Sequence, residues 1–407
     1  MGGLEDHVAV AVGIDAKVLA LREQLPATSQ TMYLNAGTNG PLPTIAIETL
    51  EAAARTELDA GRIRPGVYEG AFQRNQRVRD LIAEIYGADG SEIALTHSTI
   101  EGLNAALMGI RWQAGDEVVT TSLEHPGVFN PLGLLAFRQG VVVRTADIGN
   151  GGGDVVSQIA VLLTPRTRAV VISHVQWSSG AIMPLAELAD LAHRHHAMLI
   201  VDAAQGAGQA PIDLHASGVD VYALSGQKWL CGPEASGALY VRKSRIPDIA
   251  PTYVRYAQSC SDGFIVPPSA AYRYEIGEFY GPAVLAFERV LLWLRDDVGF
   301  DWLHARVAEL GRRAWDQLSN LPGVTVTTPR DVMAGLVCFT VYGLTVQEVA
   351  VKLYERGITI RYVAYAPGPT VARAACGWWN TEDEIDALAV AVGELAVEAA
   401  ATTAAAA

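Results

Sequence analysis

The chain contains few cysteines. Only four are spread over its 407 residues, and they form no Cys-x-x-Cys pair. This spacing argues against a disulfide framework and against a zinc site. We therefore expect no bound metal and a reducing, cytoplasmic location. The four positions are Cys231, Cys260, Cys338 and Cys376.

Clusters of positive charge and long apolar runs are missing as well. The net charge is −14, and no run of lysine and arginine suggests a basic patch. A phosphate backbone needs such a patch, so we expect no nucleic-acid partner. No apolar run is predicted to be long enough for a membrane span, and the first residues lack a signal-peptide pattern, so we expect no membrane association.

Glycine and apolar residues, in contrast, are abundant. Half of the residues are apolar and 39 are glycine, which fits a globular α/β protein of two domains. Short apolar or β-branched runs alternate with longer periodic ones, as in a parallel sheet with crossover helices. The predicted strands are 92–96, 117–120, 141–144, 169–173, 199–202, 219–224 and 237–241. The clearest predicted helices between them are 101–110, 127–138 and 185–195.

The pattern changes after about residue 282. Helical patterns at 283–295 and 302–320 precede strand-like runs at 335–342 and 359–362, and a helix begins near residue 382. We expect an N-terminal helical segment (1–30) that packs with the smaller domain and a large domain (31–281) with a mainly parallel seven-stranded sheet. A smaller α+β domain (282–399) and a frayed low-complexity tail (400–407) complete this prediction.

Two strand ends carry a chemically suggestive pair. Asp202 ends one apolar strand, and Lys228 closely follows the next one in Ser225-Gly-Gln-Lys228. A lysine amine forms a Schiff base with a carbonyl cofactor, and pyridoxal phosphate (PLP) enzymes pair that lysine with a carboxylate on the pyridinium nitrogen. A surface lysine and a strand-end aspartate are the alternative for either residue alone. The two residues together favour a PLP-binding site.

A third strand end offers an anion site. Ser98 and Thr99 lie where a predicted strand leads into a helix, and hydroxyls with free N–H groups at a helix start suit a phosphate. The same residues also satisfy an ordinary capping box, with Glu101 three residues after Ser98. His125 follows another strand, where it could stack on an aromatic ring or lie at the surface.

The order of these groups along the chain resembles that of fold-type I PLP enzymes, in the class V aminotransferase and cysteine desulfurase superfamily. The resemblance covers residues 33–385. Its most specific segments are Glu124-His125, Ser173-His174-Val175, Asp202-Ala-Ala-Gln205, Ser225-Gly-Gln-Lys228, and Arg373 followed by 379–385.

The resemblance implies a role for each matched position. Lys228 would carry the cofactor and act as the base, Asp202 would hold the ring nitrogen, and His125 would stack on the ring. Arg373 would bind the substrate α-carboxylate, which suits its bidentate fork. The implied cofactor contacts are Ser98, Thr99, Ile100, His125, Asp202, Gln205, Ser225, Gln227 and Lys228; further substrate candidates are Asn35, Trp177 and Ser178.

Some positions depart from the family pattern. Gln227 replaces a histidine before the lysine, and Ile100 replaces a phosphate-loop threonine and leaves only its backbone N–H. Glu278 stands where a threonine commonly reaches the neighbouring subunit's phosphate, so that contact is in doubt. The family is homodimeric, with the site near the interface, and the loop 258–280 could reach the partner.

The reaction type is predicted from one segment. A cysteine desulfurase needs a mobile cysteine shortly before the carboxylate arginine, and 361–373 contains none, while Cys376 is expected to be buried. The chain looks most like the C–S lyase branch, in which β-elimination from cystine, cysteine or a conjugate gives pyruvate, ammonia and a sulfur product. The alternatives are a class V aminotransferase, an isopenicillin N epimerase-like enzyme and, with less support, a non-catalytic PLP-binding protein.

Overall fold

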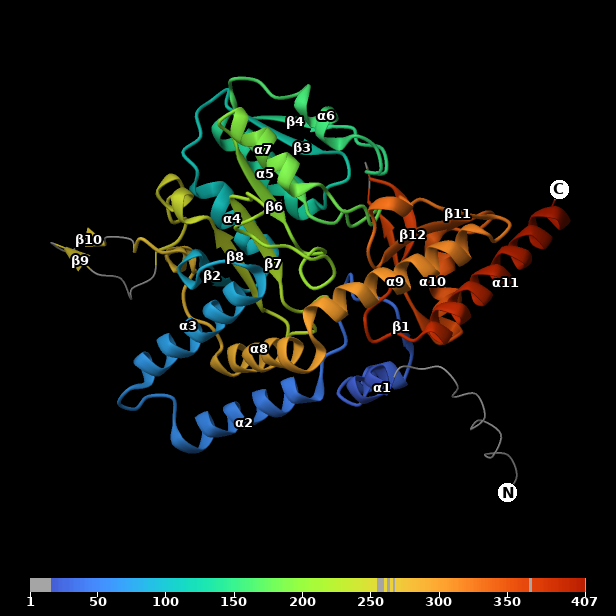
Figure 1. The fold of residues 1–407 in the computed structure, drawn as a ribbon, viewed down its shortest axis with the longest axis horizontal. Helices are drawn as coiled ribbons and strands as arrows, with labels where there is room; N and C mark the ends of the chain where they lie inside the picture. Colours follow the sequence, from blue (N-terminus) through green and yellow to red (C-terminus); the bar gives the residue numbers. More distant parts are fainter. Residues whose placement is uncertain (1–15, 255–259, 262–263, 266–267, 366–367, 407) are drawn as a thin grey trace.

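The computed structural model describes residues 16–254, 260–261, 264–265, 268–365 and 368–406. Its centre is a seven-stranded sheet of strand order β2-β8-β7-β6-β5-β3-β4 (Figure 1). β8 runs antiparallel to both of its neighbours and the other adjacent pairs are parallel. The strands are β2 (Ile93–Thr96), β3 (Glu117–Thr121), β4 (Val142–Ala146), β5 (Thr167–Ser173), β6 (Met198–Asp202), β7 (Val221–Ser225) and β8 (Gly237–Val241).

Helices cover both faces of this sheet. Alternate side chains of β5 show why: Ala169 and Val171 pack with α4 and α5, whereas Val170 and Ile172 pack with α3, α7 and α8. A strand buried on both faces is apolar at every position, which explains the continuous runs in the sequence. The helices of these layers are α3 (Val67–Tyr86), α4 (Thr99–Gly109), α5 (Pro126–Gln139), α6 (Val155–Ala160), α7 (Leu185–Arg194) and α8 (Gly281–Trp293).

A second, antiparallel sheet follows in the C-terminal part of the chain, with the order β11-β12-β15-β14. Together with its helices it forms the smaller unit, so the predicted fold class is confirmed. The boundary near residue 282 stays a prediction and falls at the start of α8. The elements here are α9 (Phe300–Ser319), β11 (Val324–Val326), β12 (Leu336–Val341), α10 (Val346–Glu355), β14 (Arg361–Ala364), β15 (Thr370–Ala375) and α11 (Glu382–Ala406).

The remaining elements are short, apart from α2. Strand β1 pairs with β13 in parallel and so joins residue 32 to residue 358. A π-helical turn, Leu294–Val298, follows α8 directly. The elements are α1 (Ala16–Arg22), β1 (Met32–Tyr33), α2 (Thr44–Ala60), β9 (Cys260–Ser261), β10 (Phe264–Ile265), β13 (Ile358–Thr359) and the 3₁₀ turns Pro26–Ser29, Gly90–Glu92, Lys243–Asp248, Ala271–Tyr274 and Arg330–Val332.

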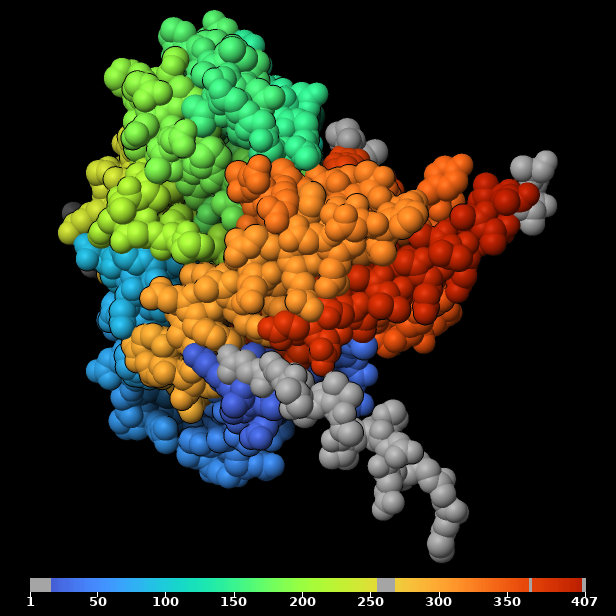
Figure 2. Space-filling model, turned by 45° about the vertical axis from the view of Figure 1, so that its right-hand side comes forward, coloured from blue at the N-terminus to red at the C-terminus, as the bar shows by residue number. Residues whose placement is uncertain are grey.

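The last helix corrects two expectations from the sequence. α11 continues through Ala406, so the alanine-rich tail that we expected to be frayed is helical. Its residues 382–404 are also long and apolar enough, by length and composition alone, to cross a membrane. However, Ile385, Leu388 and Val392 are fully buried in the core of the second sheet, and Figure 2 shows α11 in red beside α9. A buried stripe of this kind is typical of a core helix.

The N-terminal helix α1 contacts the C-terminal part of the chain through Arg22. Arg22 of α1 donates to the Trp379 carbonyl and to Glu384 of α11, both at 2.8 Å. Residues 1–15 of the predicted N-terminal segment lie outside the described residues.

Candidate active site

Lys228 lies three residues beyond the end of β7, where its side chain is half-buried. Burial, together with the nearby Arg373 and Arg361 charges, lowers the pKa of its amine to about 8, against the opposing effect of the Asp202 charge. A lysine of ordinary pKa is almost entirely protonated near neutral pH and is therefore a poor nucleophile. This lowered pKa suits an amine that bonds to a carbonyl carbon.

Asp202 ends β6, one strand away from the lysine-bearing segment. Its side chain is 4% exposed, and one oxygen, Oδ1, accepts a hydrogen bond from the backbone N–H of Ala204 at 2.8 Å. Burial raises the pKa of Asp202, while the Ala204 N–H and the Lys228 charge oppose that rise. A buried carboxylate in this position can hold a cation such as a protonated ring nitrogen.

His125 begins the helix that follows β3. Its Nδ1 accepts a hydrogen bond from the Gly127 N–H at 2.9 Å, which assigns the proton of the neutral ring to Nε2. Burial lowers the pKa of His125 to about 4, and the Lys228 and Arg373 charges add to this shift. The ring is therefore neutral at physiological pH, and its centre lies 4.6 Å from that of Trp177.

The predicted phosphate contacts are grouped at the start of α4. Ser98 caps this helix by accepting from the Glu101 N–H, so the capping interpretation of this motif is realised in the structure. The hydroxyl oxygens of Thr99 and Ser225 lie 2.6 Å apart, which brings β2 and β7 together at the helix N-terminus. Ile100 follows in the first turn with its side chain 46% exposed.

Two amide side chains complete this part of the site. Gln205 donates from Nε2 to the Gly37 carbonyl at 2.8 Å and accepts at Oε1 from the indole N–H of Trp229 at 3.0 Å. This leaves one of its two amide hydrogens for a ligand. The buried Oε1 of Gln227 has no hydrogen-bond partner among the described residues.

Arg373 lies in the centre of β15 and is 1% exposed. Its Nη1 donates to the Trp177 carbonyl at 2.9 Å, and its buried Nε has no partner in the part of the chain that the structure describes. A Cβ on Gly37 would lie 2.7 Å from the Nη2 atom, so only glycine leaves room for the guanidinium there. A buried, incompletely paired guanidinium suits a carboxylate ligand.

Sequence reasoning missed Arg361 as a site residue. It lies directly opposite Arg373 in the antiparallel β14–β15 pair, and its charge lowers the pKa of Lys228, His125 and Arg373. The only sequence signal was an arginine in the predicted strand-like run 359–362, at the start of the segment that leads to Arg373. The register that makes the two residues neighbours depends on the hairpin between them.

The other substrate candidates surround these groups. Asn35 lies in a backbone bridge with Ala375, two positions after Arg373 in the chain, and accepts at Oδ1 from Thr38 at 2.8 Å. Ser178 is 1% exposed, its hydroxyl has no partner among the residues described, and it lines a cavity of about 490 Å³. Asn35 and Trp177 therefore lie beside Arg373, while Ser178 lines the neighbouring cavity.

The cysteines and Glu278 were the remaining sequence questions. Cys376 is fully buried as expected, and burial raises the pKa of its thiol to about 12. Cys231 and Cys338 are also buried and free. Glu278 is exposed, and its charge acts on Arg74. Loop 258–280 lies partly outside the described residues.

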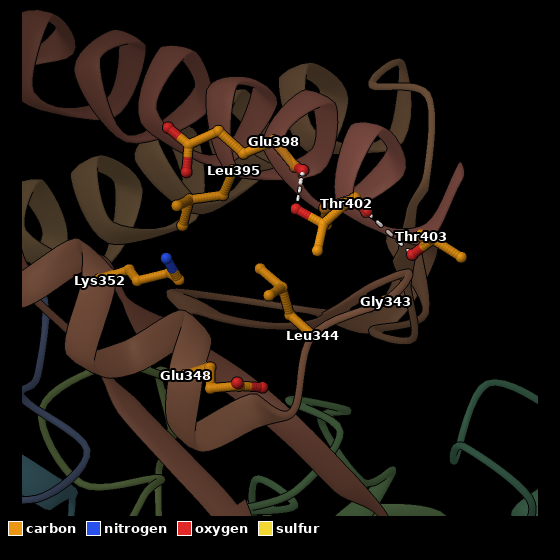
Figure 3. A pocket seen from close by; sticks show the side chains of 9 residues that line it. Gly343, Leu344, Glu348, Lys352, Leu395, Glu398, Thr402 and Thr403 are labelled. Carbon is orange, nitrogen blue, oxygen red and sulfur yellow. Dashed lines mark hydrogen bonds between the residues drawn. The ribbon is translucent and has the colours of Figure 1, made fainter. Parts of the chain in front are cut away.

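A different cavity, of about 730 Å³, lies between α10 and α11 (Figure 3). Lys352 and Glu348 line it from α10, and Leu395 and Thr402 line it from α11. It contains no residue of the predicted site.

The residues present fit PLP. One region combines a primary amine of lowered pKa, a buried carboxylate, a neutral imidazole and paired hydroxyls at a helix start. These are the groups that a Schiff-base aldehyde, a protonated pyridine ring and a phosphate require. They come from the ends of β2, β3, β6 and β7, where ligands of such sheets bind.

Similarity to known proteins supports a PLP site as well. The sequence model of the aminotransferase class-V family matches residues 48–388. A probable cysteine desulfurase of Halalkalibacterium halodurans is 28% identical over 92% of this chain and 95% of its own length. The isopenicillin N epimerase of Streptomyces clavuligerus is 29% identical over 90% and 95%, respectively.

Solved structures agree with these relatives. The cystine C–S lyase C-DES, in complex with its reaction product cysteine persulfide, superimposes with a TM-score of 0.86 at 29% identity and covers 91% of this chain and 99% of its own. A lysine-to-alanine mutant of C-DES with glycine covalently linked to its PLP cofactor gives the same TM-score at 28% identity and covers 91% and 98%, respectively. The chain therefore belongs to the aminotransferase class-V family and is a PLP-dependent enzyme.

Proposed function

We propose that the enzyme is a C–S lyase that removes the sulfur substituent of a cysteine-derived amino acid by β-elimination. The observation that carries this proposal is the absence of cysteine between Arg361 and Arg373 in the sequence. Three thiols in the described part of the chain, those of Cys231, Cys338 and Cys376, are buried and free, and burial raises the pKa of each. A buried neutral thiol is a poor sulfur acceptor.

In this proposal, each residue of the site has a separate role in the elimination. PLP, when bound, supplies the electron sink that makes the substrate α-hydrogen acidic. Lys228, as a free amine, takes the proton from Cα, and the Cβ–S bond breaks with its electron pair leaving on sulfur. Asp202 would keep the pyridine nitrogen protonated, and His125 would contact the ring. Water completes the reaction and gives pyruvate, ammonia and a thiol or persulfide.

The two adjacent arginines support a substrate with two carboxylates. Arg373 holds the α-carboxylate, and Arg361, half-buried on the neighbouring strand, binds the carboxylate of the leaving group. Cystine has this form, and the similarity to a cystine C–S lyase supports the same choice. The pair also keeps two like charges close together, and an anionic substrate would relieve the repulsion between them.

The test is product analysis with several substrates. The enzyme is incubated with L-cystine, cysteine sulfoxides and ordinary amino acids, with and without 2-oxoglutarate. We expect sustained pyruvate formation from at least one sulfur amino acid without any keto acid. Turnover that requires 2-oxoglutarate would instead indicate an aminotransferase.

Epimerisation is the second candidate, and the Streptomyces clavuligerus relative supports it. An epimerase conserves the amino acid and exchanges its α-hydrogen with solvent. In deuterated water, a deuterated and racemised amino acid without pyruvate would favour epimerisation over elimination.

We also propose a homodimer in the cytoplasm. The end of α2, the turn after it and the start of α3 present a group of exposed apolar side chains. Single exposed apolar residues are common, whereas a group of them marks an interface. Light scattering of the protein and of an Ile63→Glu variant would test this, since a charge there should favour the monomer. The exposed residues are Leu58 at 70%, Ile63 at 79%, Tyr68 at 62% and Phe72 at 51%.

A further inference from the structure

Glu124 lies in the loop between β3 and α5, directly before His125. Its side chain is 3% exposed and accepts four hydrogen bonds. Thr121 Oγ1 and Gln176 Nε2 donate to one carboxylate oxygen at 2.6 and 2.9 Å. The backbone N–H and the hydroxyl of Ser173 donate to the other oxygen at 3.0 and 2.5 Å. All of these partners are buried as well.

The bonded segments are those that carry the active-site groups. Gln176 is followed by Trp177, whose carbonyl accepts from Arg373. Ser173 ends β5 opposite Asp202 in the parallel β5–β6 register. His125 is covalently adjacent to Glu124 itself. One carboxylate therefore joins the loop between β3 and α5 to the segment 173–177, which lies beside Asp202 at the sheet edge.

We propose that Glu124 is a positioning residue that fixes His125, the Trp177 carbonyl and Asp202 relative to one another. We infer that it supplies geometry rather than negative charge, because all four of its hydrogen bonds come from neutral donors. Burial raises its pKa, the donors from Gln176, Ser173 and Thr121 oppose that rise, and the nearby Asp202 charge adds to it. The proposal rests on the PLP site and does not depend on which reaction follows.

The surroundings of Glu124 make glutamine a conservative replacement. The Oε1 of Gln176 is buried and has no partner among the described residues. Rotating that amide by half a turn would present Oε1 to the new amide of Glu124→Gln, and the Thr121 hydroxyl can accept as well as donate. The Ser173 donors keep their acceptor. Glu124→Gln thus preserves the four contacts, whereas Glu124→Ala removes them all.

Glu117 provides a matched control at the other end of the same strand. It is fully buried and also accepts four hydrogen bonds, from Arg144, Thr164 and, twice, Arg166. These partners lie at the opposite edge of the sheet from Lys228. Glu117→Ala should therefore destabilise the fold without disturbing the cofactor pocket.

The experiment measures the holoenzymes of the native protein and of Glu124→Gln, Glu124→Ala and Glu117→Ala. The readouts are the PLP dissociation constant, the circular dichroism of the bound cofactor, KM and kcat for one amino-acid substrate, and the thermal midpoint. Circular dichroism in the cofactor band reports how the ring is held, which a loss of stability alone would not change.

We expect Glu124→Ala to weaken cofactor binding and raise KM by about 10- to 100-fold, since small displacements of positioned groups have effects of that size. Its cofactor dichroism should change, and Glu124→Gln should restore native values. Equal spectral changes in Glu117→Ala would overturn the proposal, as would a Glu124→Gln variant as impaired as Glu124→Ala or an unchanged Glu124→Ala. The cofactor readouts need no sulfur substrate, so they remain informative if the lyase proposal fails.

Discussion

Replacing Arg373 by alanine tests the arrangement of the substrate site most directly. The guanidinium is 1% exposed, it donates to the Trp177 carbonyl at 2.9 Å, and its Nε lacks a partner within the described ranges. A carboxylate bound there would form a desolvated, charge-assisted pair. The methyl group of alanine would leave that carboxylate with no charged partner of its own.

The expected loss follows from the burial of the pair. Truncating one partner of a buried, hydrogen-bonded charge pair costs about 2–5 kcal/mol. Each 1.36 kcal/mol corresponds to a factor of ten in kcat/KM, so Arg373→Ala should lower kcat/KM by about 30-fold to several thousand-fold. The half-buried Arg361 is screened by solvent, so Arg361→Ala should have the smaller effect.

The assay compares a substrate with its analogue that lacks the carboxylates. The native enzyme should prefer L-cystine to cystamine, and Arg373→Ala should lose most of that preference while still binding PLP. Arg166→Ala, at the opposite edge of the sheet, serves as the control. If Arg373→Ala lowered kcat/KM equally for both compounds, or for neither, Arg373 would not bind the carboxylate.

Three further results are expected. PLP should load onto the apoprotein faster as pH rises through about 8, because only the free Lys228 amine attacks and burial has lowered its pKa. A midpoint of the loading rate near pH 10 would show that the pKa of Lys228 is not lowered. Asp202→Ala should retain some PLP but lose exchange of the substrate α-hydrogen with deuterated water, because the ring nitrogen loses its counter-charge. Unchanged exchange would show that Asp202 has only a structural role. Cys376→Ala should leave pyruvate formation largely intact, and a collapse of turnover would point to a thiol relay.

The elements of the large sheet could be predicted well from the sequence. Strands such as Met198–Asp202 are buried on both faces, so their apolar runs stand out, and ligand groups at their ends were found for that reason. The site groups Lys228, Asp202 and His125 are brought to one edge because parallel strands place their ends there.

Long-range pairing explains what the sequence did not reveal. Arg361 becomes a neighbour of Arg373 only through the register of β14 with β15, and no local pattern reports a register. Glu124 was recognised as part of a motif, but its hydrogen-bond partners Ser173 and Gln176 lie 49 and 52 positions later in the chain. The tail of α11 was mistaken for a frayed end, although alanine is the strongest helix former.

The two sheets contribute different parts of the active site. The large sheet positions Lys228, Asp202 and His125, whereas Arg361 and Arg373, the two arginines proposed to bind the substrate carboxylates, come from the smaller antiparallel sheet. Mutations in β14 and β15 could therefore exchange one amino acid for another as substrate while the groups that do the chemistry stay untouched. Such a division lets a lineage explore new substrates without rebuilding its catalyst, and it makes these two strands the natural place to redesign selectivity.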